Sequence, residues 1–204
     1  MRDLFAGVTR FQQRKHPELR SRFEQLANGQ QPDALLITCS DSRVDPALLT
    51  DCQPGELFVI RNAGNIVGRH GEADLGIAAT IEYAVKALRV PQIIICGHTR
   101  CGAMSGLLNP ESTSSLPNVS KWVATADHAL KASPLDQDAD RLTQVIRANI
   151  RLQLRNLMTF PCVADAVEAR RLKLKGWLYD FESGTVDVLS PETDRFNSPA
   201  SCTV

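Results

Sequence analysis

Three short apolar segments, each ending abruptly in polar or glycine residues, constrain the fold of this chain most strongly. Residues 34–39, 57–62 and 92–96 are rich in Leu, Ile, Val and Phe, and such runs are typical of buried strands. Between the second and third strands, residues 74–90 repeat apolar side chains with helical spacing. Because strand and helix alternate, we expect right-handed crossovers and a parallel sheet. The sequence therefore predicts an α/β fold, a single domain with a mainly parallel central β-sheet flanked by helices.

The first residues predict a helical arm on this domain. Apolar side chains in residues 1–32 recur with the spacing of one or two amphipathic helices, which we expect to break near Pro17. We expect this N-terminal helical arm to be part of the same domain as residues 33–190, which contain the strands.

The second half of the chain predicts a long helix, a pair of strands and a tail. Residues 139–160 carry an apolar stripe suited to packing on the sheet or on another subunit. Two strands are expected around the turn Glu182-Ser183-Gly184. Residues 191–204 contain two prolines, and we expect them to form a loose C-terminal tail.

Charge balance and cysteine content narrow the class of protein. Among 204 residues, Lys plus Arg number 23 and Asp plus Glu number 23, which gives no support for a nucleic-acid partner or an anionic membrane surface. No stretch approaches the roughly 18 apolar residues of a membrane-spanning helix, and the first residues lack a signal-peptide pattern. The six cysteines are therefore interpreted as thiols or metal ligands, and we expect a cytoplasmic protein.

Three potential zinc ligands follow two of the predicted strands. Cys39 ends the first strand, and His98 and Cys101 follow the third. The carboxyl ends of parallel strands meet at one edge of a sheet, so these side chains are expected to converge. Two thiolates and one imidazole suit zinc and leave a fourth position for water or substrate, which indicates a catalytic metal. A structural zinc site, or buried thiols without metal, are the competing interpretations.

Two charged residues next to Cys39 can assist such a metal. Asp41 and Arg43 lie two and four residues after this cysteine and can form a charge-assisted pair. An aspartate held ionised by arginine can accept a hydrogen bond from a zinc-bound water and orient it. Asp41 can alternatively occupy the fourth zinc position itself and close the site. The spacing permits both arrangements.

Several segments together resemble a known family. They are CSDSRVDP, PGELFVIRNAGNIV, IEYAVKALRV, CGHTRCGAMSGLL and the late GWLYDFESG. As a set they strongly resemble the β-class carbonic anhydrases, over roughly residues 2–190. The resemblance implies that residues 33–190 are a zinc-binding catalytic domain.

The resemblance also implies a mechanism. One Zn²⁺ per chain would be held by Cys39, His98 and Cys101, with Asp41 and Arg43 as the activating dyad. A zinc-bound hydroxide oriented by this dyad would hydrate carbon dioxide reversibly to bicarbonate and a proton.

Gln30 indicates the open, plant-like type of this family, in which zinc keeps a water. It lies nine residues before the first cysteine ligand. The matching substrate-pocket residues would be Phe58, Ala63, Tyr83 and Gly102. The resemblance places this pocket at a dimer interface, so a homodimer or a dimer of dimers is expected, with carbon dioxide and bicarbonate as its small-molecule partners.

The loop after NAGNIV departs from many relatives, because this chain has GRHGEADLG there. The departure introduces His70, a possible proton shuttle, since an exposed imidazole titrates near neutral pH. The other histidines and cysteines, and two polar residues after the second strand, are interpreted as surface, packing or loop-bracing residues. They are His16, His128, Cys52, Cys96, Cys162, Cys202, Arg61 and Asn62.

Two other functions compete with carbon dioxide hydration. Hydrolysis of carbon disulfide or carbonyl sulfide would use the same zinc ligands, so these residues do not distinguish it. A non-catalytic scaffold that binds zinc or bicarbonate is the other alternative. The pair of Asp41 and Arg43 argues against a scaffold, which has no need for an activated water.

Overall fold

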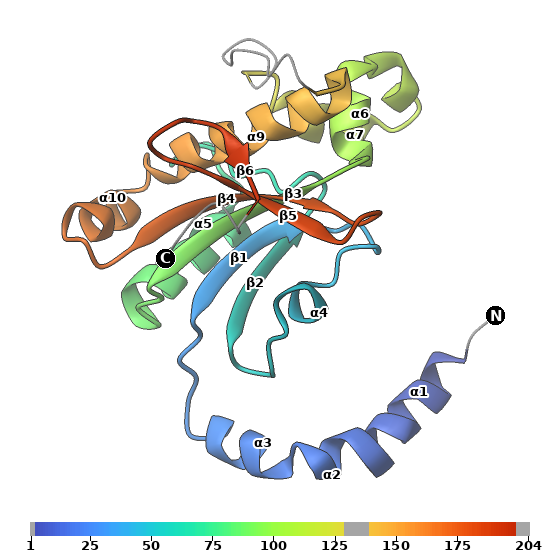
Figure 1. Cartoon of the computed structure of the whole chain (residues 1–204), viewed down its shortest axis with the longest axis vertical. Coiled ribbons are helices and arrows are strands. Elements are labelled where there is room, and N and C mark those ends of the chain that lie inside the picture. The colour runs from blue at the N-terminus through green and yellow to red at the C-terminus, as the bar shows by residue number, and fades with distance from the viewer. Residues whose placement is uncertain (1–2, 129–138, 199–204) are drawn as a thin grey trace.

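The computed structural model describes residues 3–128 and 139–198, which form a six-stranded sheet flanked by helices (Figure 1). The strand order is β2-β1-β3-β4-β5-β6. β1 to β4 pair in parallel, whereas β5 and β6 are antiparallel additions at one edge. The strands are β1 (Ala34–Cys39), β2 (Leu57–Asn62), β3 (Gln92–His98), β4 (Lys173–Asp180), β5 (Thr185–Leu189) and β6 (Phe196–Asn197). The predicted α/β fold with a mainly parallel sheet is confirmed.

The strand register brings the carboxyl ends of the parallel strands to one edge. Cys39 at the end of β1 pairs with Asn62 at the end of β2. β3 runs to His98, two residues beyond its predicted end, because its last two residues still pair with β4. Both predicted ligand segments therefore leave the sheet at the same edge.

One face of the sheet is covered densely by helices. The larger apolar cluster joins this face to α5, α6, α7, α9 and α10. α9 packs very close to the strands because two glycines leave room for it. A Cβ at Gly97 or Gly176 would lie 2.9 or 2.8 Å from the side chain of Ile150. The helices on this face and their connecting turns are α5 (Leu75–Glu82), the π-helical η2 (Tyr83–Ala87), α6 (Gly102–Leu108), the 3₁₀-helical η3 (Pro110–Thr113), α7 (Pro117–Ala124), α9 (Arg141–Leu157) and α10 (Pro161–Glu168).

The opposite face has a smaller core. It consists of four buried side chains on β1 and β3, against which Leu49 of α4 (Pro46–Thr50) packs. Buried residues thus lie on both faces of β1, as its continuous apolar sequence predicts.

The N-terminal arm is helical, as predicted, and consists of α1 (Leu4–Arg10), the π-helical η1 (Phe11–Lys15), α2 (His16–Glu18) and α3 (Arg20–Leu26). Its helical path breaks at Leu19, whereas the nearby Pro17 is itself helical. A proline inside a helix lacks the N–H donor and crowds the carbonyl four residues earlier. The wider π-helical turn directly before Pro17 accommodates both effects.

The arm extends away from the sheet (Figure 1). Arg22 ties it to the loop before β2, donating from Nε to the Pro54 carbonyl at 2.6 Å and from Nη2 to Glu56 at 2.8 Å. Apolar side chains along the first part of the arm are solvent-exposed within one chain. They are Leu4, Phe5, Val8 and Phe11.

Residues 191–198 correct the prediction of a loose tail. Phe196–Asn197 forms β6 and pairs with β5. Arg151 of α9, only 6% exposed, binds Asp194 at 2.9 Å and lies 5.1 Å from the Phe196 ring. A buried guanidinium requires a carboxylate, and this contact fixes a segment whose prolines suggested little structure. Residues 199–204 of the predicted tail lie outside the described residues.

None of the helices in the described ranges is long and apolar enough to cross a membrane.

Candidate metal centre

Three side chains converge at the carboxyl edge of the sheet, as the sequence predicts. Cys39 ends β1, His98 ends β3, and Cys101 is the residue before α6. All three are buried, and two sulfurs and one imidazole nitrogen lie within 4.8 Å of one another. In the part of the chain that the structure describes, no second group of this kind occurs. Three protein ligands at such spacing are what a catalytic zinc site uses.

A backbone carbonyl fixes the tautomer of His98. Nδ1 lies 2.8 Å from the Thr99 carbonyl oxygen, which can only accept, so Nδ1 carries the proton. Nε2 therefore presents a lone pair, and this buried atom has no hydrogen-bond partner. A buried nitrogen without a partner is costly, and a metal ion is the partner that its two thiol neighbours indicate. The donor set fits zinc.

The pKa values of the two thiols are shifted in opposite directions. A hydrogen bond from Cys101 lowers the pKa of the Cys39 thiol against the opposing effect of burial, and the Gly64 N–H, 3.3 Å from Cys39 Sγ, lowers it further. The Cys39 sulfur and burial raise the pKa of Cys101, while N–H groups at the start of α6 act in the opposite direction. Zinc favours the thiolate of both cysteines because it replaces their shared proton.

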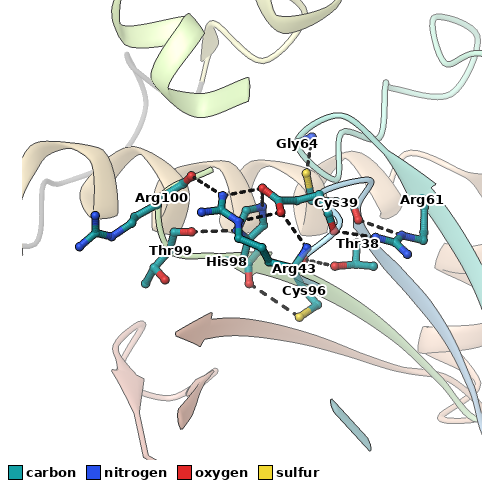
Figure 2. Close-up of polar contacts among 11 residues, drawn as sticks. Thr38, Cys39, Arg43, Arg61, Gly64, Cys96, His98, Thr99 and Arg100 are labelled. Carbon is teal, nitrogen blue, oxygen red and sulfur yellow. Dashed lines mark hydrogen bonds and ion pairs between the residues drawn. The ribbon is translucent and has the colours of Figure 1, made fainter. Parts of the chain in front are cut away.

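Arg43, which is labelled in Figure 2, forms a close ion pair with Asp41 near the His98 ring. Arg43 donates from Nε to Oδ1 at 2.9 Å and from Nη2 to Oδ2 at 2.6 Å. These hydrogen bonds hold the pKa of the Asp41 carboxyl well below its usual range, so it remains ionised. Oδ2 lies 3.8 Å from Nε2 of His98. The carboxylate is therefore adjacent to the three candidate ligands.

Arg61 and Asn62 brace the loops of the site, as the sequence predicts. Arg61 donates to the carbonyl oxygens of Cys39 at 3.0 Å and Asp41 at 2.8 Å (Figure 2). Asn62 exchanges two hydrogen bonds with the backbone of Ile66. These contacts fix the chain that follows Cys39 and the loop that carries Gly64.

A column of buried amide side chains on α9 holds the same loop and was missed by the sequence reasoning. Asn149 donates to the Gly64 carbonyl at 2.9 Å. Gln153 accepts from the Val67 N–H at 2.8 Å, and Asn156 donates to the Val67 carbonyl at 2.6 Å. The sequence does carry a signal for this column, because the three polar residues recur with helical spacing. The segment was interpreted only by its apolar stripe.

The predicted pocket residues fall into two groups within one chain. Ala63 follows β2 and Gly102 follows Cys101, so both lie at the edge that holds the ligands. Phe58 lies near the start of β2, about 13 Å from its end at 3.3 Å per residue. The Tyr83 ring lies 6.0 Å from that of Phe58, and Gln30 is exposed in the loop before β1.

His70 lies apart from the metal ligands. Its ring is 5.3 Å from that of Phe160, and with Cys162 these residues line a pocket of about 320 Å³ that contains none of the three ligands. The structure gives no support to a shuttle role, which stays a prediction.

The remaining cysteines and histidines lie as the sequence suggested. Cys96 is fully buried, and burial raises its pKa to about 12. Cys52 and Cys162 are half-buried free thiols, and His16 and His128 are exposed. Cys202 lies outside the described residues.

Gly64 leads to a prediction about this centre. Its φ is +80°, and a Cβ there would lie 2.9 Å from that of Ala103. We expect Gly64→Ala to lower the free energy of unfolding by about 1–3 kcal/mol and to weaken zinc binding, because the loop must move its N–H away from Cys39. Urea unfolding measures the free energy of unfolding, and zinc titration measures the affinity for zinc. Gly71→Ala is the control, since it has φ +86° with open space around it. Equal losses in both variants would contradict a role for the close approach.

Fold and site together define an α/β zinc enzyme, and comparison with known proteins identifies its family. A family model described as "Carbonic anhydrase" matches residues 34–186. The carbonic anhydrase of Pseudomonas aeruginosa is 47% identical over 203 residues, which cover 98% of this chain and 92% of that protein. That of Synechococcus elongatus is 43% identical, covering 91% of this chain and 70% of that protein.

Solved structures of beta-carbonic anhydrases are also similar to this chain. The beta-carbonic anhydrase CcaA has a TM-score of 0.90 and 40% identity to this chain, covering 96% of this chain and 98% of CcaA. A structure of tetrameric beta-carbonic anhydrases from Sordaria macrospora has a TM-score of 0.72 at 33% identity, covering 92% of each chain. The chain belongs to the β-carbonic anhydrase family, whose members are zinc enzymes.

Proposed function

We propose that this protein catalyses the reversible hydration of carbon dioxide to bicarbonate and a proton. The observation that carries the proposal is the ion pair of Asp41 and Arg43, whose carboxylate lies 3.8 Å from Nε2 of His98. We propose that Asp41 stays paired with Arg43 and leaves the fourth coordination position to water. Relatives named carbonic anhydrase support the same activity.

The roles of the residues follow from their contacts. Zinc held by Cys39, His98 and Cys101 would supply Lewis-acid activation of a water. Asp41, kept ionised by Arg43, accepts a hydrogen bond from the reacting water and turns an oxygen lone pair toward the carbon. Arg43 fixes the direction of the carboxylate by binding both of its oxygens.

The ion pair predicts activity that persists around neutral pH. A carboxyl with a depressed folded-state pKa loses its charge, and its contribution to stability, only as pH falls through that lowered value. We therefore expect kcat/KM for hydration, measured by stopped flow, to show no cooperative collapse near neutral pH. A steep loss there, with Asp41 found on the metal in a crystal structure, would overturn the open-site assignment.

We also propose a homodimer or dimer of dimers in which a second copy completes the substrate pocket. Phe58 and Tyr83 lie too far from the ligand edge to line that pocket within their own chain. Tyr83 is 51% exposed, and the arm carries exposed apolar residues, including Phe5 at 79%. We expect sedimentation velocity to show a dimer or larger, and Phe5→Asp to shift it toward monomer. A fully active monomer would contradict this proposal.

The cytoplasm is the proposed location. None of the five cysteines among the described residues forms a disulfide, and a reducing compartment keeps cysteines in that state.

The substrate is tested by comparing carbon dioxide with carbonyl sulfide and carbon disulfide on the same zinc-loaded protein. We expect carbon dioxide to have the highest kcat/KM. A higher value for either sulfur compound would assign the protein as a hydrolase instead.

A further inference from the structure

Arg43 is held from three directions, and the sequence suggested only one of them. Asp41 binds its guanidinium through both carboxylate oxygens. The Arg100 carbonyl accepts a hydrogen bond from Nη2 at 3.2 Å (Figure 2). The third contact is the ring of Phe181, whose centroid lies 4.3 Å from Cζ of Arg43. Phe181 follows β4, far from Arg43 in sequence.

The same ring lies near a metal ligand. The Phe181 and His98 rings have centroids 6.4 Å apart and are tilted by 46°. Phe181 is thus adjacent to both the ion pair and the ligand set.

The turn that carries this ring is fixed by Asp180. Oδ1 of Asp180 accepts from the Thr99 hydroxyl at 3.1 Å and from the Glu182 N–H at 3.0 Å, and Oδ2 accepts from the Ser183 hydroxyl at 2.7 Å. Thr99 is also the residue whose carbonyl orients His98. One carboxylate therefore links the turn to the loop that follows the histidine ligand.

The contact with the Phe181 ring matters because the Arg43 side chain is partly exposed to solvent. The Arg43 side chain is 45% exposed, whereas that of Asp41 is 16% exposed. An exposed guanidinium on a flexible stem exchanges its partners with water, and an aromatic face restricts that motion. An aliphatic side chain could fill the same space but has no negative π-face.

We propose that Phe181 is a positioning residue for the hydration reaction, because its ring holds the Arg43 guanidinium in the orientation that binds Asp41. The inference rests on the proposed function, since it requires Asp41 to orient the reacting water. We assign Phe181 no contact with substrate or zinc.

Phe181→Leu and Phe181→Tyr test the proposal, since the first removes the aromatic face and the second keeps it. For the leucine variant we expect a two- to fivefold loss of kcat, roughly the strength of an exposed cation–π contact, with KM and zinc content unchanged. The tyrosine variant should recover the wild-type kcat. In ¹⁵N-arginine-labelled protein, the Arg43 Nε–H resonance should lose its ring-current shift in the leucine variant and regain it with tyrosine.

Phe196→Leu is the matched control, because the Phe196 ring also lies near a guanidinium, that of Arg151, but belongs to β6, the edge strand farthest from β1 and β3 on that side of the sheet. It should leave kcat and the Arg43 resonance unchanged. An unchanged kcat in Phe181→Leu, a failure of tyrosine to restore it, or an unmoved Arg43 resonance would each overturn the positioning role.

Failure of the positioning role of Phe181 can be distinguished from failure of the proposed function. If Asp41→Asn retains full turnover, the proposed role of the ion pair fails. If Asp41→Asn loses turnover while Phe181→Leu does not, only the role of Phe181 fails.

Discussion

Cys101→Ser is expected to lose zinc and, with it, all measurable turnover. A serine hydroxyl is a poor zinc ligand, and only Cys39 and His98 would remain. Loss of a residue that merely supports a ligand typically weakens metal binding by 10–100-fold, so loss of a ligand should cost more than about 100-fold. Metal analysis after dialysis should find well under one zinc per chain.

Cys96→Ala is the control for this experiment. Cys96 lies on β3, two residues before His98, and is as deeply buried as the ligands, but burial raises its pKa to about 12 and keeps it a neutral thiol. This variant should keep full zinc content. Retention of zinc by Cys101→Ser would contradict the assignment of Cys101 as a ligand.

Asp41→Asn is expected to keep zinc and lose most of its turnover. The amide has nearly the same shape as the carboxylate, but its NH₂ group repels Arg43 and one of its two acceptor oxygens is gone. Removing a positioned acid–base group typically costs about 10²–10⁴ in rate, and we expect a loss of kcat in that range. Stopped-flow hydration and metal analysis on the same sample measure both quantities.

Asp51→Asn is the matched control for the loss of one negative charge. Asp51 is an exposed residue at the end of α4 with φ 52°, a conformation that asparagine tolerates well. Its kcat should equal that of the wild type. Zinc loss in Asp41→Asn would instead place the aspartate on the metal, and full activity would remove it from the mechanism.

The parallel strands and the metal ligands could be predicted because their signals are local. The first and third strands are continuous apolar runs, and a run of this kind predicts a strand buried on both faces wherever it lies in the chain. The carboxyl ends of parallel strands lie at one edge of the sheet. Cys39 and His98 could therefore be expected to lie near each other before anything was known of the side-chain packing. The ion pair of Asp41 and Arg43 follows from two residues of separation.

The support around the site depends on contacts between distant segments, which sequence spacing does not reveal. Asn149 reaches the Gly64 carbonyl across 85 residues, and the ring of Phe181 reaches Arg43 from the other end of the chain. The ordering of residues 191–198 likewise depends on a buried Arg151 that needs Asp194. The separation of Phe58 and Tyr83 from the ligand edge also emerged only from the strand register.

We propose that a zinc site formed by Cys39, His98 and Cys101 hydrates carbon dioxide. It is tested most directly by stopped-flow hydration on purified protein of known metal content, before chelation, after chelation, and after zinc is restored. We expect about one zinc per chain, rapid hydration, its loss on chelation and its return with zinc. About one zinc per chain with hydration no faster than the uncatalysed rate would contradict it.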